Sequence, residues 1–145
     1  MILGVETLRC PMLKSLSFMA LMLTHLGFSK IQKVDYQFVQ DATKDANVII
    51  FDARTDKYFD QQVIPNAKHL PGNSTDQKID EILKGIPKER KIIVYCGGIE
   101  CPASEWLSEK LDKKGYTNIF EYKGGIEEWR KKGQATENYP LKLNK

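Results

Sequence analysis

The fold is decided by the stretch KIIVYCGGIECPASEWL, which occupies residues 91–107. Its first part, residues 91–95, is rich in β-branched and aromatic side chains, which is typical of a buried strand. Two glycines follow Cys96 and allow the chain to turn sharply. Pro102 then suits the first position of a helix, where its missing N–H costs no hydrogen bond. The stretch therefore predicts a strand, a tight loop that begins at Cys96, and a helix over residues 102–114.

The remainder of the chain repeats this alternation of strands and helices. Short apolar runs predict further strands, and stretches with a helical pattern lie between them. Strands that are separated by helices need crossover connections, which produce a mainly parallel sheet, so the fold class is α/β. The predicted strands are 47–52, 67–70, 91–95 and 118–122, and the predicted helices are 36–43, 75–83, 102–114 and 126–132.

The length and composition are those of one globular domain. The 145 residues fit a single core. The formal net charge is +3, from 22 basic and 19 acidic residues, which is too balanced to predict binding to nucleic acid. The three cysteines are too few for a disulfide-stapled scaffold, and with two histidines and no Cys-x-x-Cys pair the chain lacks the pattern of a zinc site. We expect neither a metal nor another cofactor.

The first 29 residues have the features of an export signal. Residues 16–28 are mostly apolar, but the run is too short to span a bilayer comfortably, which takes about 20 residues. Basic residues precede this run, and Gly-Phe-Ser at 27–29 forms a small-x-small cleavage pattern. We predict a signal peptide or N-terminal anchor over 1–29 and a periplasmic or secreted domain over 30–145, with no stable membrane span in the mature domain. The alternative is an N-terminal helix that packs on the domain of a cytoplasmic protein.

Cys96 is the residue on which we expect the chemistry to depend. A buried strand delivers it to the carboxyl edge of the sheet, where ligands bind in open α/β folds. The loop 97–101 can point backbone N–H groups inward, and the following helix presents its positive end, so the thiolate form of Cys96 is favoured. Such a site can also hold a sulfur anion attached to the cysteine as Cys–S–S⁻. An inert buried cysteine is the alternative, but the order of strand, cysteine, glycine pair and proline-started helix favours a reactive one.

This segment resembles the active-site region of the rhodanese family. Other stretches match that family in the right order, and together the resemblance covers about residues 31–133. The matching stretches are VIIFDAR at 48–54, IPNAKHLP at 64–71, IVYC at 93–96, GYTNI at 115–119 and YKGGIEEW at 122–129.

The resemblance implies a central parallel sheet of about five strands and a sulfurtransferase activity. Cys96 would be the catalytic residue, accepting sulfane sulfur from thiosulfate or a persulfide and passing it to a thiol, to cyanide or to a protein. The partners would therefore be a small-molecule sulfur donor and a thiol or protein acceptor, and we expect a monomer. The loop around the persulfide would consist of Gly97, Gly98, Ile99, Glu100 and Cys101.

Two charged residues are candidates for supporting roles. Arg54, in the Asp-x-Arg signature, is expected to anchor loops near the site through hydrogen bonds. Lys123 precedes the Gly-Gly pair and would place positive charge near the loop, although an ordinary solvated lysine is the simpler interpretation. Trp106 and Trp129 are expected to pack in the core or at the edge of the domain.

The chain departs from the family pattern at several positions. Cys101 stands where many members carry an arginine. Gln62 and Val63 stand where many have a Gly-His pair, and Asn66 replaces a glycine. Without the loop arginine, and with Glu100 adding like charge, we expect thiosulfate to be a poor donor.

Three other functions compete with sulfur transfer. A phosphatase or arsenate reductase needs an arginine at the end of the cysteine loop to bind an oxyanion, and residues 97–103 contain none. A thiol–disulfide protein would use Cys96 and Cys101, provided that their Cα atoms come within about 7 Å of each other. A non-catalytic binding module has no need of the cysteine that this chain retains.

Overall fold

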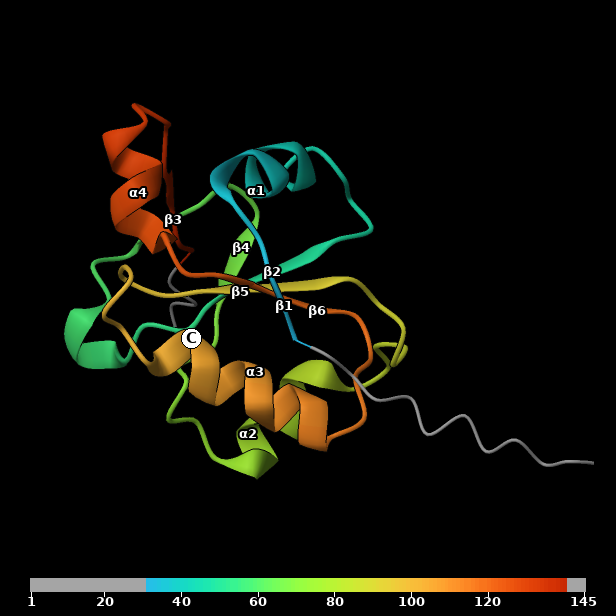
Figure 1. Ribbon diagram of the computed structural model, residues 1–145. Helices are drawn as coiled ribbons and strands as arrows, with labels where there is room; N and C mark the ends of the chain where they lie inside the picture. Colours follow the sequence, from blue (N-terminus) through green and yellow to red (C-terminus); the bar gives the residue numbers. More distant parts are fainter. Residues whose placement is uncertain (1–30, 141–145) are drawn as a thin grey trace, which may run out of the picture.

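The computed structural model describes residues 31–140, which form a parallel sheet covered by helices on both faces (Figure 1). The sheet has five strands in the order β1-β6-β5-β2-β4, and all neighbouring strands run parallel. The predicted α/β fold is confirmed. In chain order the elements are β1 (Gln32–Lys33), α1 (Tyr36–Ala42), β2 (Ile49–Asp52), a 3₁₀ turn (Asp56–Tyr58), β3 (Gln62–Val63), β4 (Ala67–His69), α2 (Asp76–Leu83), β5 (Ile92–Tyr95), α3 (Ala103–Lys113), β6 (Ile119–Tyr122), α4 (Gly125–Lys131) and β7 (Glu137–Asn138).

The signal peptide or anchor predicted over residues 1–29 lies outside the described residues. Within residues 31–140, none of the helices combines the length and the apolar character that crossing a membrane requires.

Strand β5 lies at the centre of the sheet and carries the site. It pairs with β2 on one side and with β6 on the other. All four of its residues are buried, because neighbouring strands cover its edges and helices cover its faces. This double coverage explains why the strand consists of consecutive apolar residues and shows no polar alternation.

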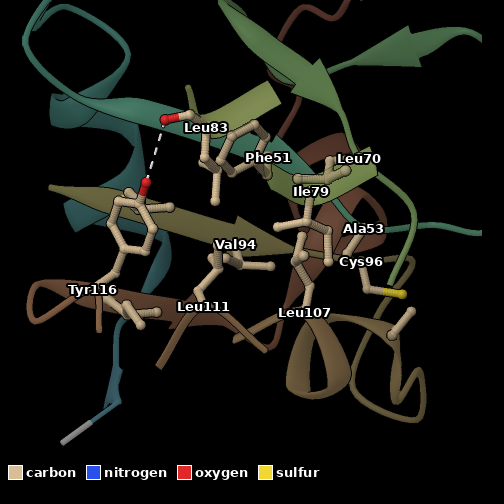
Figure 2. Close-up of a cluster of buried hydrophobic side chains, with 13 residues drawn as sticks. Phe51, Ala53, Leu70, Ile79, Leu83, Val94, Cys96, Leu107, Leu111 and Tyr116 are labelled. Atoms are coloured by element: carbon tan, nitrogen blue, oxygen red, sulfur yellow. Dashed lines mark hydrogen bonds between the residues drawn. The ribbon is translucent and has the colours of Figure 1, made fainter. Parts of the chain in front are cut away.

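The two faces of the sheet hold separate hydrophobic clusters. Successive side chains of a strand point to opposite faces, so Val94 packs with Leu107 and Leu111 on the face covered by α2 and α3 (Figure 2). Ile93 and Tyr95 pack on the other face, which α1 and α4 cover (Figure 1). Ala103, Leu107 and Leu111 recur at four-residue spacing along α3, and this apolar stripe is buried.

Some short elements were not predicted, and most predicted boundaries differ from the observed ones by one or two residues. Strands β1, β3 and β7 contain two residues each, too few for a periodic pattern. Pro102 was expected at the first helical position, but it is the N-cap of α3, which begins at Ala103. Helix ends are the least specified part of a sequence pattern, and a proline is compatible with either position because neither needs its N–H.

Candidate functional site

Cys96 lies directly after β5, at the carboxyl end of the sheet. Its side chain is only 1% exposed and belongs to the hydrophobic cluster between the sheet and α3. Figure 2 shows it at the end of that cluster, close to Ala53 and Leu107. The sequence placed Cys96 at this edge, and the structure shows in addition that the sulfur lies below the protein surface.

The loop 97–101 is held at both of its ends by backbone hydrogen bonds. The carbonyl oxygens of Cys96 and Gly97 accept from the N–H groups of Ile126 and Glu127, at 3.0 and 2.9 Å, so the start of α4 fixes the start of the loop. The N–H of Cys101 donates to the carbonyl of Gly98 at 3.0 Å, which closes a turn. The Cys101 N–H is thus engaged within the loop and is not available for the inward-pointing group of donors expected from the sequence.

Cys96 and Cys101 are joined by a disulfide across this loop. Their Cα atoms are 6.1 Å apart, within the range of about 4.4–6.8 Å that disulfides require. The geometric condition for a thiol–disulfide pair is therefore met. Cys101 is half-buried and packs against the same cluster as Cys96, but it also lines the surface pocket described next.

An open pocket of about 1270 Å³ lies over the loop. Residues 97–103 form one wall, and residues from the segments 54–60 and 123–131 form the others. Tyr58, Ile99 and Trp106 line this pocket with exposed fractions of 66%, 71% and 46%, and they are the large apolar side chains that the described chain leaves most exposed. Apolar surface gathered around a concavity is typical of a ligand or partner site.

The two tryptophans have different environments. Trp129 is buried in the cluster under α1 and α4, as predicted, and its Nε1 donates to the carbonyl of Ala135 at 2.9 Å. The packing role predicted for Trp106 is wrong, because its side chain is 46% exposed at the pocket. The reason is the position of Trp106 on α3. Trp106 does not share the spacing of Ala103, Leu107 and Leu111, so its side chain faces away from the sheet.

Arg54 is an anchor at the end of β2. Its Nε lies 3.1 Å from both carboxylate oxygens of Asp52, its Nη1 donates to Asp60 at 2.9 Å, and its Nη2 donates to the carbonyl of Gln62 at 2.6 Å. The side chain is 4% exposed. Burial lowers the pKa of Arg54, but the two carboxylates outweigh this and raise the pKa above its ordinary value. Its N–H groups bind Asp52 and hold the loop over residues 60–62, so most of them are not free for an anionic ligand.

Asp60 links this anchor to α4, and no pattern in the sequence indicates this role. Arg130 donates to Asp60 Oδ2 at 2.7 Å, while Arg54 binds the other oxygen. Burial raises the pKa of Asp60, but hydrogen bonds from Arg130, the Gln62 N–H and Arg54 together lower it to about 2. The carboxylate is therefore ionised at neutral pH and joins two walls of the pocket.

Lys123 lines the pocket, but its charge is balanced by carboxylates. Its Nζ lies 3.5 Å from Glu121 and 3.8 Å from Glu105. Glu121 is itself buried and accepts a 2.8 Å hydrogen bond from the hydroxyl of Ser104. Lys123 therefore compensates a buried negative charge, and the ordinary solvated lysine of the simpler interpretation is not what the structure shows.

Three carboxylates lie beside the loop, although the pocket lining as a whole holds as many cations as carboxylates. Glu100 is exposed on the loop, and Glu127 and Glu128 line the pocket from the first turn of α4. The nearest cations, Arg54 and Lys123, are already paired with carboxylates. Arg130 also lines the pocket and binds Asp60, and Lys131 is a lining cation without an ion-pair partner within residues 31–140. A doubly charged anion beside the loop would therefore meet three carboxylates, with Lys131 as the unpaired cation that could offset their repulsion.

Comparison with known proteins yields several relatives. The thiosulfate sulfurtransferase GlpE of Coxiella burnetii is 28% identical over 91 residues, which cover 62% of this chain and 78% of that protein. A sulfurtransferase of Allochromatium vinosum is 27% identical over 106 residues, which cover 71% of this chain and 92% of that protein. A tRNA uridine(34) hydroxylase of Aster yellows witches'-broom phytoplasma is 33% identical over 96 residues, but the match covers only 29% of that protein.

Solved structures share the fold. The BH2092 protein of Bacillus halodurans superimposes with a TM-score of 0.65 at 28% identity, covering 74% of this chain and 77% of that one. The rhodanese-like domain of the Alr3790 protein from Anabaena gives a TM-score of 0.60 at 22% identity, covering 79% and 85% of the two chains. The family model of the rhodanese-like domain matches residues 35–132. The parallel sheet, the cysteine after β5 and this match over more than half of the sequence together show that the chain belongs to the rhodanese-like domain family.

Proposed function

We propose that this domain is a sulfurtransferase in which Cys96 carries a sulfane sulfur atom as a persulfide. The observation that carries the proposal is the position of Cys96 at the carboxyl end of the central strand, next to a loop that forms one wall of an open pocket. The names of two relatives, a thiosulfate sulfurtransferase and a sulfurtransferase, point to the same class of reaction.

The proposed reaction consists of two exchanges of sulfur–sulfur bonds on the reduced protein. The Cys96 thiolate attacks the outer sulfur of the donor; with thiosulfate, the donor's S–S bond breaks, sulfite leaves with the electron pair, and Cys96–S–S⁻ remains. An acceptor such as a thiolate or cyanide then attacks the outer sulfur, and Cys96 leaves as the thiolate. Each exchange replaces one sulfur linkage by another, so the transfer consumes neither an oxidant nor a reductant.

No histidine is proposed to take part in these steps. The Nε2 of His69 lies 2.8 Å from the carbonyl oxygen of Arg54, and its ring stacks on Phe59 with the centroids 3.6 Å apart. Because these contacts hold the imidazole ring, we do not assign it the role of a general base. The nucleophile is therefore a thiolate that forms without a neighbouring base, which is feasible for cysteine but not for serine.

Single-turnover loading of two variants tests the assignment of the nucleophile. The proteins are first reduced, then mixed with a sulfur donor, and the intact mass is measured. Cys101→Ser should gain the mass of one sulfur atom, about 32 Da, because its Cys96 thiol is free to accept sulfane sulfur. Cys96→Ser should gain none. Serine nearly matches cysteine in volume, so both variants should keep the wild-type circular dichroism spectrum. Sulfur on Cys96→Ser and none on Cys101→Ser would reverse the assignment.

A further inference from the structure

We propose that Cys101 is a resolving thiol: it attacks a persulfide on Cys96, releases hydrosulfide and closes the Cys96–Cys101 disulfide. This inference rests on the proposed function, because it needs a persulfide on Cys96. It adds a second activity to the domain, the reduction of sulfane sulfur to sulfide at the expense of a dithiol.

The geometry that brings the two sulfurs together does not depend on the bond between them. The start of the loop is fixed by hydrogen bonds from Ile126 and Glu127, and Cys101 is fixed by its hydrogen bond to Gly98. These are backbone contacts, and none of them involves a sulfur atom. The loop should therefore keep its shape when the disulfide is reduced, with the Cα atoms near the observed 6.1 Å. A thiol held this close reacts as part of the same molecule and has a large advantage over thiols in solution.

The burial of the two cysteines favours the same division of roles. Cys96 is 1% exposed, whereas Cys101 is half-buried and lines the pocket. Cys101 lines the pocket, whereas Cys96 is not among the residues that line it, so the internal thiol competes with every acceptor that enters from the pocket. In the disulfide the accessible sulfur is that of Cys101. A reductant entering the pocket should attack there and expel Cys96 as the thiolate, which restores the nucleophile.

The resolving step conserves atoms and electrons. The Cys101 thiol loses its proton, its thiolate attacks the Cys96 Sγ, and the bond from Sγ to the outer sulfur breaks. The outer sulfur leaves with the electron pair and takes up the proton as HS⁻, so Cys96–S–S⁻ plus Cys101–SH gives the disulfide plus HS⁻. The sulfane sulfur is reduced by two electrons, and the two cysteines are oxidised to a disulfide. An external dithiol, of small molecule or protein, then reduces this disulfide and becomes a disulfide itself.

The test is a single turnover without reductant and without oxygen. Pre-reduced protein is mixed with a saturating concentration of thiosulfate, a donor that leaves sulfite, so that any sulfide must come from the persulfide. The wild type should release roughly one sulfide per chain, since each persulfide carries one sulfane sulfur, and should become about 2 Da lighter than the reduced protein. Cys101→Ser should release almost none and should accumulate the adduct of about 32 Da instead. A donor-free sample controls for oxidation by other routes.

The possible results separate the two proposals. If the wild type keeps the persulfide and releases no sulfide, the resolving role is wrong while the persulfide carrier stands. If the sulfur is found on Cys101 by peptide mapping, Cys101 relays sulfur, and the resolving role is likewise overturned. If Cys101→Ser fails to load sulfur on Cys96, the proposed function itself is contradicted. Sulfide release together with disulfide formation, in the wild type only, supports both.

Discussion

The hydroxyl of Tyr95 donates a 2.8 Å hydrogen bond to the buried carboxylate of Asp52, across the boundary between β5 and β2. The same hydroxyl accepts the N–H of Ile64 at 3.0 Å. Tyr95 directly precedes Cys96, so this contact fixes the end of the strand that carries the sulfur. Burial, followed by the neighbouring Asp52 charge, raises the pKa of Tyr95 well above its usual value, so the hydroxyl is protonated and remains a donor at neutral pH.

Replacing Tyr95 by phenylalanine should destabilise the fold. The change leaves the Ile64 N–H without its acceptor and removes one hydrogen bond to Asp52 Oδ2, which Arg54 still binds. An unsatisfied buried group costs about 1–3 kcal/mol. Urea denaturation followed by circular dichroism measures the loss. Tyr116→Phe is the matched control, because its buried hydroxyl makes only two long hydrogen bonds of 3.4 Å, and the loss should be smaller. Equal losses in the free energy of unfolding of the two variants would contradict the larger stabilising contribution expected of the Tyr95 hydroxyl.

Gly125 is a position where any side chain should disturb the site. It has a φ of +60°, and an added Cβ would meet the Cys96 carbonyl oxygen and would lie 2.8 Å from the Gly97 carbonyl carbon. Gly125→Ala should therefore lower stability and slow the loading of sulfur onto Cys96. Gly133→Ala is the control, since Gly133 has a φ of +71° but nothing within 4 Å of the added Cβ. It should lose about 1 kcal/mol from backbone strain alone and should load sulfur at the wild-type rate, as single-turnover kinetics can measure.

The identity of residue 101 should set the preference between donors. Cys101→Arg places a free cation on the loop among Glu100, Glu127 and Glu128, so it should lower the KM for thiosulfate by about tenfold, which corresponds to one charge-assisted hydrogen bond. Cys101→Ser separates this effect from the loss of the disulfide, and its KM should stay near that of the reduced wild type. Steady-state kinetics with thiosulfate and with a persulfide donor provide the comparison. A low KM for thiosulfate in the wild type, unchanged by the arginine, would contradict the electrostatic argument.

Asp60 should make stability depend on pH in the acid range. Its pKa in the folded protein is about 2, below the ordinary 3.8, so its contribution is present above 3.8 and is lost as the pH falls from there to about 2. Asp60→Asn should lower stability at neutral pH by no more than about 1 kcal/mol, because the carboxylate is half-exposed and screened. The difference in Tm from the wild type should shrink between pH 5 and pH 3. Asp56→Asn is the control, because Asp56 has no ion-pair partner within residues 31–140; a constant difference for Asp60→Asn over this range would refute the assignment.

The long elements and the place of Cys96 could be predicted because each has a strong local pattern. The apolar run of β5 and the stripe of Ala103, Leu107 and Leu111 on α3 are each sufficient to predict which of their residues are buried, without information from distant parts of the chain. The structure adds the N-cap of α2, where Thr75 Oγ1 accepts the Lys78 N–H at 3.3 Å.

The contacts between distant segments could not be predicted from a pattern. Asp60 joins Arg54 to Arg130, but neither spacing is a motif, and the pairing exists only because the fold brings these segments together. Asn66 stands where many family members have a glycine, and it has a φ of 66°, a left-handed conformation that asparagine tolerates better than most residues. The substitution therefore keeps the backbone shape that a glycine would give.

The antiparallel ribbon of β3 and β7 extends the working domain beyond its family match. The match ends at residue 132, but Glu137 and Asn138 pair with Val63 and Gln62, and the Tyr139 N–H donates to the Gln61 carbonyl at 2.7 Å. A chain shortened to the family boundary would also lose the carbonyl that receives the Trp129 indole, leaving a buried donor unsatisfied under α4. Because α4 holds the start of the cysteine loop, removing the residues after 132 would weaken the support that α4 gives to this loop.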